Sequence, residues 1–266
     1  MSNIKKLDQK EMMEMNPVTR VACCMVLDVS YSMNGKPIEE LEKGFKVFIE
    51  QASKDPKTKD TIQLAIVTVG HKDFSGLTPE DSRNPKDGVK QIFDFNQEWK
   101  GMDCPNFELG GFTALGEGVE LALDLVSKQK ELQRKTAGGY NQPWILLMTD
   151  GKPYDHPSRI EKFGKYMGVD DDGNKIKNSI NDIAEKTSEL VKNRKINVIP
   201  VVTGPEADSD IVRVFNNGGK VLRIKNLDFK AFFKFFTATI GDPSENWEKA
   251  WDREKAKDYL KSLKED

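Results

Sequence analysis

The sequence has little cysteine and almost no histidine, the two side chains that most often hold zinc in proteins. Its 266 residues include three cysteines and two histidines. Cys23 and Cys24 are adjacent in an apolar run, and Cys104 stands apart from them. An odd number of cysteines without paired spacing argues against a disulfide framework and against a zinc site. We therefore expect a protein of a reducing, cytoplasmic compartment.

Long apolar runs and an excess of one charge are also missing. No run approaches the roughly 18 residues that a membrane-spanning helix needs. Residues 1–19 carry charges throughout, so we interpret them as an N-terminal extension rather than a secretory signal. The 41 basic and 43 acidic residues leave a net charge of −2, which gives no electrostatic basis for binding nucleic acid or an anionic membrane. We expect partners of neither kind.

Short apolar runs rich in Val, Ile and Leu predict buried strands. Such near-continuous runs are typical of a parallel sheet that is covered on both faces. The five runs are Val21–Leu27, Ile62–Val69, Trp144–Met148, Asn197–Val202 and Lys220–Ile224, and Ile92–Phe95 is a candidate edge strand.

Apolar residues at helical spacing separate these runs and predict five helices. The segments are Ile38–Ala52, Leu115–Val126, Ile180–Val191, Ser209–Asn216 and Phe229–Ile240. Strands that alternate with helices predict an α/β fold with a doubly wound, mostly parallel open sheet and helices on both faces. We assign residues 20–241 to this domain.

The last part of the sequence follows a Gly-Asp-Pro break and is rich in charge. We predict that residues 242–266 form a C-terminal helical appendage packed on the domain, with one helix over Glu245–Lys264. Trp247 and Trp251 fall on one side of that helix. We interpret them as packing anchors rather than as a binding face.

Five oxygen-bearing side chains fall where strands end or a helix begins. Asp28, Ser30 and Ser32 directly follow the first strand, and alternate residues of an extended chain point the same way. Asp150 follows a later strand, and Thr113 precedes a helix. In open α/β sheets, ligands bind beyond the carboxyl ends of strands, where the strand order reverses. The two aspartates meet there if the first strand and the strand before Asp150 are neighbours.

All five groups present oxygen, and three are neutral hydroxyls, which points to a hard divalent cation. Soft or borderline metals would favour Cys or His. Mg²⁺ takes about six oxygen ligands and keeps several waters, so it suits so sparse a set, and Mn²⁺ could replace it. Two aspartates offset a divalent charge, but the metal stays electrophilic if either of them acts through water. Such a site favours one more carboxylate, from a Glu or Asp of a protein partner.

Each of these residues also has an ordinary structural interpretation. Asp28 could cap the end of a strand, and Ser30 and Ser32 are common in turns. Thr113 could be a helix N-cap, a role that is compatible with metal binding. These interpretations account for single residues but not for all the motifs together.

The three motifs together resemble the metal-ion-dependent adhesion site (MIDAS) of von Willebrand factor A (VWA) domains. The stretch DVSYS is similar to their D-x-S-x-S signature, and Thr113 in GGFTALGEG and Asp150 in MTDG match the other two parts. The resemblance spans roughly residues 21–240. It implies a Rossmann-like sheet, metal-dependent binding of a protein partner and usually no catalysis. It also implies that the two serines and the threonine bind the metal directly and that the aspartates act partly through water.

Within that family, the sequence around the motifs looks most like that of bacterial proteins linked to tellurium resistance and stress response. The stretches are LDVSYSMNGKPIEELEKGF, GGFTALGEGVELAL and LLMTDGKP. Some of those proteins carry a cysteine-rich, zinc-binding tail, which has no counterpart here, so no role of that tail is carried over. The resemblance implies a metal-dependent interaction module in a system of that kind.

Other candidate residues have simpler explanations. His71 and His156 are interpreted as surface histidines. Asp170–Asn174 hints at calcium, but Asn181 stands where an EF-hand needs Glu, so we interpret the stretch as a solvated turn. The long Gly151–Asn178 segment follows Asp150, and we expect it to select the partner because it surrounds the metal edge.

Two alternatives to an interaction module stay open. One is a Mg²⁺-dependent phosphatase with Asp28 as the nucleophile. The haloacid-dehalogenase-type pattern needs a second Asp two residues later, where this sequence has Ser30. The other is a scaffold protein whose metal only stabilises loops and so raises the melting temperature. No base is evident for Cys104 either, and we expect a protein that is not an enzyme.

Overall fold

The computed structural model describes residues 19–70, 88–111, 113–136, 139–151, 180–204, 207–241, 246–255, 257 and 260–266. Several expectations fall outside these ranges. They concern almost all of the N-terminal extension, His71, His156, the Asp170–Asn174 stretch and nearly the whole Gly151–Asn178 segment. These expectations stay predictions.

A seven-stranded sheet forms the centre of the described part of the chain, in the order β3-β2-β1-β4-β5-β6-β7. The strands are β1 (Val21–Asp28), β2 (Ile62–Val69), β3 (Val89–Phe93), β4 (Trp144–Thr149), β5 (Asn197–Thr203), β6 (Leu222–Ile224) and β7 (Leu263–Glu265). The five inner strands pair in parallel, whereas β3 and β7 run antiparallel at the two edges. The predicted doubly wound, mostly parallel sheet is confirmed.

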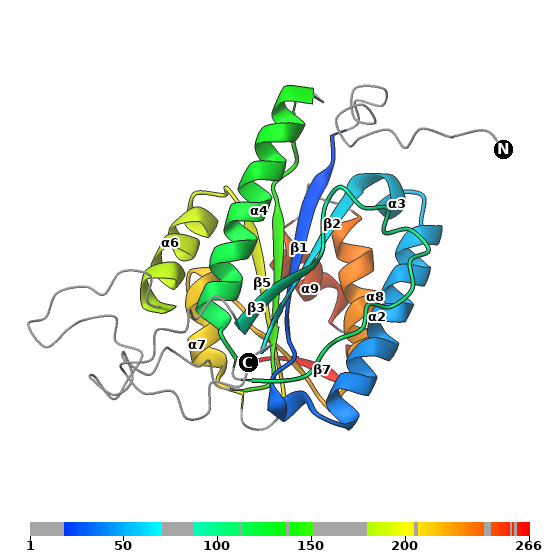
Figure 1. Cartoon of the computed structure of the whole chain (residues 1–266), viewed down its shortest axis with the longest axis vertical. Helices are drawn as coiled ribbons and strands as arrows, with labels where there is room; N and C mark the ends of the chain where they lie inside the picture. Colours follow the sequence, from blue (N-terminus) through cyan, green and yellow to red (C-terminus); the bar gives the residue numbers. More distant parts are fainter. Residues whose placement is uncertain are drawn as a thin grey trace, which may run out of the picture.

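Helices cover both faces of this sheet, as predicted (Figure 1). One face carries α2 (Lys36–Lys54), α8 (Phe229–Ile240) and α9 (Trp247–Glu254), and the other carries α4 (Leu115–Thr136), α6 (Ile180–Lys192), α7 (Ser209–Arg213) and the 3-10 turn η3 (Val214–Asn216). Two short elements, η1 (Tyr31–Met33) and α3 (Thr58–Thr61), follow β1 and precede β2. Alternate residues of β1 point to opposite faces, so Cys23 and Cys24 belong to different cores.

Helix α8 is apolar on more than one side. It packs against the sheet on one side and against α9 on another. Its five buried phenylalanines are Phe229, Phe232, Phe233, Phe235 and Phe236. Burying each ring contributes roughly 1.5–3 kcal/mol to stability. The Phe236 ring packs edge-on against Trp144 of the sheet, whereas the Phe235 ring meets Trp251 of α9 in a T-shaped contact at 5.5 Å. Trp251 is 2% exposed and Trp247 is 1% exposed, so both are packing anchors, as predicted.

The C-terminal segment returns to the sheet, which the prediction of one helix over Glu245–Lys264 does not anticipate. Helix α9 ends at Glu254, and Leu263–Glu265 form the edge strand β7, so the second half of that prediction is wrong. The physical reason is that Leu263 is 5% exposed in the core and that the backbone of β7 pairs with the otherwise open edge of β6. The domain boundary at residue 241 stays a prediction.

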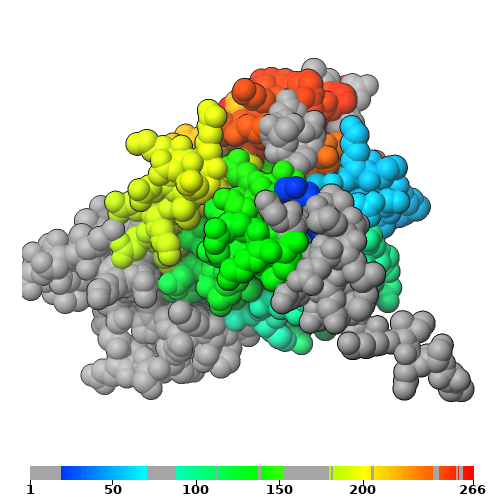
Figure 2. Space-filling view, turned by 90° about the horizontal axis from the view of Figure 1, so that it is seen from above, coloured from blue at the N-terminus to red at the C-terminus, as the bar shows by residue number. Residues whose placement is uncertain are grey.

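The carboxyl ends of the parallel strands share one edge of the sheet, where the site residues lie. β1 pairs with β4, and the chain continues from β1 to β2 on one side and from β4 to β5 on the other. The strand order therefore reverses between β1 and β4. Figure 2 views the opposite edge, with α6 and the α2–α3 region on either side of α4. None of the described helices is long and apolar enough to cross a membrane.

Candidate metal site

Asp28, the last residue of β1, is the centre of a hydrogen-bond network at this switch point, and it is 1% exposed. Its Oδ1 accepts a hydrogen bond from the backbone N–H of Ser30 at 2.8 Å. Its Oδ2 accepts hydrogen bonds from the hydroxyls of Thr113 at 3.1 Å and Thr149 at 2.6 Å. These bonds compensate for the burial of the carboxylate and fix its orientation.

A second set of contacts joins the two serines to Asp150. The hydroxyl oxygens of Ser30 and Ser32 lie 3.0 Å apart, and the Ser32 hydroxyl donates to Oδ1 of Asp150 at 2.7 Å. Ser32 is exposed, whereas the other members of the cluster are buried. The structure thus brings together all five residues that the sequence singled out, which are Asp28, Ser30, Ser32, Thr113 and Asp150. The cluster opens to solvent at Ser32.

The side chain of Thr113 belongs to this cluster and not to the helix that follows it. Helix α4 begins at Leu115, whose N–H donates to the backbone carbonyl of Thr113 at 2.8 Å. The Thr113 hydroxyl donates instead to Asp28. The hydroxyl of Thr113 therefore contacts the carboxylate of Asp28. The first helical hydrogen bond of α4 runs from the N–H of Gly118 to the carbonyl of Ala114, so Ala114 and not Thr113 stands at the N-cap position of the helix.

Close backbone contacts hold the loop after β1 in place. The N–H of Gly110 donates to the carbonyl of Val29 at 3.0 Å. Gly70, directly after β2, has φ of +114°, and a Cβ atom there would lie only 2.6 Å from the backbone nitrogen of Ser30. Only glycine allows both this backbone conformation and this approach. The loop is therefore fixed from two sides.

Burial penalises the ionised form of both carboxylates of the cluster, and the charge of Asp28 adds to the penalty at Asp150. Burial raises the pKa of Asp28, while hydrogen bonds from Ser30, Thr149 and Thr113 act in the opposite direction. Burial, and then the nearby charge of Asp28, raise the pKa of Asp150 to about 6. A compensating cation between them would remove this penalty.

The chemistry of the donors fits Mg²⁺ or Mn²⁺. The cluster offers two carboxylates and three hydroxyls at one point, and hard cations prefer oxygen. Among the described residues, no group of three or more His, Cys, Asp or Glu side chains could hold a metal ion. Serine and threonine oxygens would therefore have to complete the coordination together with water.

Thr149 is part of the cluster, and the prediction from sequence missed it. Its hydroxyl makes the shortest of the three recorded hydrogen bonds to Asp28. Strand alternation could have identified it, because Leu27 pairs with Met148 and the next residues, Asp28 and Thr149, lie side by side. We assign Thr149 a positioning role, since it orients Asp28.

The cysteines are unsuited to nucleophilic chemistry. Cys23 and Cys24 are buried in β1, and burial raises the pKa of both thiols. Burial and the charge of Glu42 raise the pKa of Cys104 to about 11. A thiol with a pKa this high holds its proton at neutral pH.

Comparison with known proteins identifies the sequence pattern and the fold. The profile of the von Willebrand factor type A domain matches residues 24–232. No curated protein matches the sequence. Among solved structures, the pilus adhesin SpaC from Lactobacillus rhamnosus GG aligns with a TM-score of 0.54 at 14% identity, over 84% of this chain and 30% of that one.

Two further structures align at lower scores. The proximal thread matrix protein 1 from the mussel byssus, described with a zinc-occupied MIDAS motif, has a TM-score of 0.49 at 15% identity over 85% of this chain. The vWF domain of the pilus tip protein Mfa5 from Porphyromonas gingivalis has a TM-score of 0.49 at 11% identity, over 84% of this chain and 95% of that one. The chain spans 46% of the mussel protein.

Proposed function

We propose that this chain, which belongs to the von Willebrand factor type A domain family, binds Mg²⁺ or Mn²⁺ at the cluster around Asp28 and uses the metal to bind a protein partner. The observation that carries the proposal is the continuous network of contacts from Thr113 through Asp28 and the two serines to Asp150. Ordinary capping or turn chemistry would not join three separate motifs at one point.

The charge balance of the cluster favours an acidic group on the partner. Both oxygens of Asp28 already accept hydrogen bonds, so this carboxylate would act on a metal mainly through its charge and through the hydroxyls it orients. Neutral hydroxyls would supply the direct contacts and leave the cation electrophilic. A Glu or Asp side chain of a partner would complete its coordination.

The proposal is tested by capture of partner proteins on the immobilised full chain. We expect proteins that bind in Mg²⁺, are released by EDTA and are not captured by an Asp150→Asn variant. Capture that persists in EDTA and with the variant would contradict the proposal. A metal that raises the melting temperature while capture is independent of it would support a scaffold role instead.

Two exposed apolar side chains next to the cluster support a binding surface here. The large hydrophobic side chains that are exposed among the described residues are Tyr31, Leu109 and Val214. Tyr31 lies between the two serines, and Leu109 precedes the Gly110 contact with the loop after β1. Aromatic side chains are enriched at protein interfaces, so the exposed Tyr31 ring beside the cluster favours a binding surface here.

We predict that Tyr31→Ala reduces capture of the partner about tenfold without changing the affinity for Mn²⁺, because an exposed ring at 55% exposure contributes contact area but no metal ligand. Capture is quantified from dose-response curves, and Mn²⁺ binding is followed by electron paramagnetic resonance. Val214→Ala, at 45% exposure and away from the cluster, is the matched control. Equal losses in both variants would contradict a binding surface at Tyr31.

The affinity for metal should fall as the pH falls. The pKa of Asp150 is about 6 in the metal-free fold, and the metal requires the ionised carboxylate. A proton competing at this pKa makes binding about tenfold weaker at pH 5 than at pH 7.5. Titration calorimetry with Mg²⁺ at the two pH values checks this result, and equal affinities would contradict it.

The raised pKa of Asp150 also determines how the stability of the metal-free protein changes with pH. The folded protein holds the proton of Asp150 more tightly than the unfolded chain, whose Asp pKa is near 3.8. The free energy of unfolding measured in EDTA should therefore decrease as the pH rises from about 4 to about 6. Saturating Mg²⁺ should remove this decrease.

A phosphatase remains the alternative, and the hydrogen bonds at Asp28 disfavour it. The hydrogen bonds that Oδ1 and Oδ2 of Asp28 accept withdraw electron density from both oxygens and so lower the nucleophilicity of this carboxylate. Mg²⁺-dependent hydrolysis of p-nitrophenyl phosphate that is lost in Asp28→Asn would reverse this ranking.

We also propose a bacterial stress-response or tellurium-resistance-type setting in the cytoplasm. The wording of the DVSYS, GGFTALGEG and MTDG stretches supports it, together with the small number of cysteines. Deleting the gene in its host should increase sensitivity to tellurite or to another stress. Unchanged growth under all of these conditions would contradict the setting without affecting the metal site.

A further inference from the structure

A groove of about 840 Å³ runs from the metal cluster along the carboxyl ends of the strands. Ser32 and Asp150 line it on the side of β1 and β4. Lys225, directly after β6, and Lys264 and Asp266 of the β7 segment line it on the other side. The groove therefore connects the metal cluster to an edge of the sheet that the last residues of the chain complete.

Among the described residues that line the far part of the groove, positive side chains outnumber negative ones. Arg223 donates hydrogen bonds to the carbonyls of Gly204 and Ala207 and pairs with Asp266. Lys264 pairs with the other oxygen of Asp266 at 2.7 Å. Lys225 is exposed, and no ion pair to it is recorded within the described part of the chain. In the described lining, three cationic side chains thus lie near one side-chain carboxylate, and two of the three are paired with it.

The turn that presents Lys225 has an unusual backbone. Asn226 and Leu227 are consecutive residues with φ of +54° and +57°, a region that non-glycine residues seldom adopt and that is costly for a bulky side chain. The turn is held because the N–H of Lys225 donates to the carbonyl of Ser262 and the N–H of Asp228 donates to the carbonyl of Lys225. The pairing of β6 with β7 therefore fixes where Lys225 lies.

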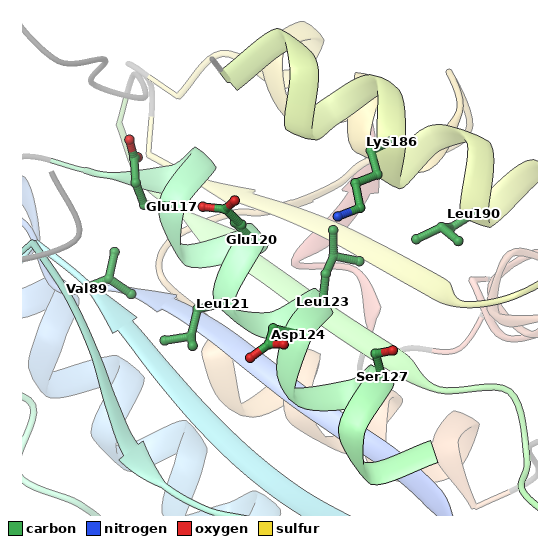
Figure 3. Close-up of a pocket in the computed structure, with 9 residues that line it drawn as sticks. All are labelled: Val89, Glu117, Glu120, Leu121, Leu123, Asp124, Ser127, Lys186 and Leu190. Atoms are coloured by element: carbon green, nitrogen blue, oxygen red, sulfur yellow. The ribbon is translucent and has the colours of Figure 1, made fainter. Parts of the chain in front are cut away.

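A second groove, between α4, α6 and β3, has the opposite charge (Figure 3). Its volume is about 640 Å³, and α4 contributes the carboxylates of Glu117, Glu120 and Asp124, against Lys186 from α6. Asp124 pairs with Lys128 at 2.6 Å, so the described lining disfavours an acidic chain here only weakly. Of these two grooves, the one along β6 and β7 has the described lining that favours an acidic partner.

We propose that the groove along β4, β5 and β6 is a second subsite, which binds a further acidic residue of the partner segment whose first carboxylate binds the metal. This inference rests on the proposed metal-dependent function. The occupant is an extended peptide segment of a partner protein. Lys225 and Lys264 hold its second carboxylate, and Arg223 supports the wall of the groove through Gly204.

The sheet geometry sets the spacing of the two acidic residues. Thr149 pairs with Val202, and Thr203 pairs with Ile224, so Asp150 and Ile224 are separated by two strand spacings. Two spacings are about 10 Å, and an extended peptide advances about 3.3 Å per residue. Because alternate residues of an extended peptide point the same way, the second acidic residue should stand two or four residues from the first.

The test is a displayed peptide library with one fixed Glu and five random positions on either side of it. The library is selected on the full chain in Mg²⁺ and eluted with EDTA. We expect enrichment of Asp or Glu two or four residues from the fixed Glu. The enrichment should disappear on the Lys225→Glu, Lys264→Glu double variant and persist on Lys54→Glu, an exposed helix position at the opposite edge of the sheet.

The strongest enriched peptide then gives the quantitative result by fluorescence anisotropy. The double variant should bind it at least about tenfold more weakly, and the difference should shrink at high salt because the contacts are exposed. Mn²⁺ affinity should be unchanged in the variant. EDTA-eluted peptides without an acidic preference, or with the same affinity for the variant, would overturn the subsite and leave the proposed function standing. No EDTA-eluted peptide at all, although the chain binds Mn²⁺, would overturn both.

Discussion

Replacing Asp28 with Asn is expected to weaken Mg²⁺ and Mn²⁺ binding by about 100-fold without lowering the stability of the metal-free protein. Asp28 supplies one of the two charges of the cluster and orients the hydroxyls of Thr113 and Thr149. An amide removes the charge and changes one acceptor into a donor. In the metal-free fold that charge is unfavourable, because burial raises the pKa of Asp28 and its charge raises the pKa of Asp150.

The two effects are measured by thermal unfolding with EDTA and with Mg²⁺. A ligand at 100 times its Kd stabilises the native state by about 2.7 kcal/mol, so the wild type should gain several degrees in melting temperature. The variant should melt no lower than the wild type in EDTA and should gain nothing from Mg²⁺. Asp60→Asn, on exposed α3 at the opposite edge, is the control for loss of one charge. If Mg²⁺ stabilised the Asp28→Asn protein as much as the wild type, the assignment of Asp28 to the metal site would be contradicted.

Replacing Gly70 with Ala is expected to reduce the free energy of unfolding by about 1–3 kcal/mol and to weaken metal binding at least tenfold. The added Cβ atom would lie 2.6 Å from the nitrogen of Ser30 and 2.8 Å from the carbonyl oxygen of Gly110. Both are backbone atoms that cannot rotate away, so the loop after β1 must shift. That shift would disturb the hydrogen bond from Ser30 to Asp28 and the position of the Ser30 hydroxyl.

The matched control is Gly218→Ala, measured by the same denaturant unfolding and Mn²⁺ titration. Gly218 also has positive φ, at +74°, but a Cβ atom there would meet nothing within 4 Å. The control therefore isolates backbone strain from the clash with the site. Equal stability losses in the two variants, together with unchanged Mn²⁺ affinity in Gly70→Ala, would show that Gly70 does not hold the loop after β1 in its metal-binding position.

The inner strands and the long helices could be predicted from sequence because each has a strong apolar pattern. The runs at Ile62–Val69 and Phe229–Ile240 match β2 and α8 at both ends. From the sequence, Asp28 and Asp150 could be expected to meet only if β1 and β4 are neighbours, because strand order depends on pairing between residues 121 positions apart. The structure shows that β1 and β4 do pair, so the two aspartates lie at the ends of neighbouring strands.

The two edge strands were harder to predict for a physical reason. β3 spans Val89–Phe93, and the predicted run at Ile92–Phe95 overlaps it only partly. Most residues of β3 are half-buried, so the strand has no continuous apolar pattern that marks its bounds. β7 has three residues in a charged stretch, and only Leu263 is buried. Its structure comes from pairing with β6, which no local pattern encodes. The second subsite could not be predicted for the same reason, because only the pairing of β6 with β7 brings Lys264 close to Lys225.

The site itself was largely predictable, because motif and position agreed. Asp28, Ser30 and Ser32 are consecutive alternate residues, and the structure keeps them together through short contacts. Thr149 was missed because it lies inside a strand, where a hydroxyl carries no motif of its own, and its role follows from the register of β1 and β4.

The most direct measurement is anomalous diffraction from a crystal of the full chain grown with Mn²⁺. We predict one strong peak at the switch point between β1 and β4, about 2.1 Å from the hydroxyl oxygens of Ser30 and Ser32. We also predict that a carboxylate from a neighbouring molecule or water occupies an open position of this ion. A crystal in millimolar Mn²⁺ with no peak at these oxygens, or with its peak elsewhere, would contradict the metal site.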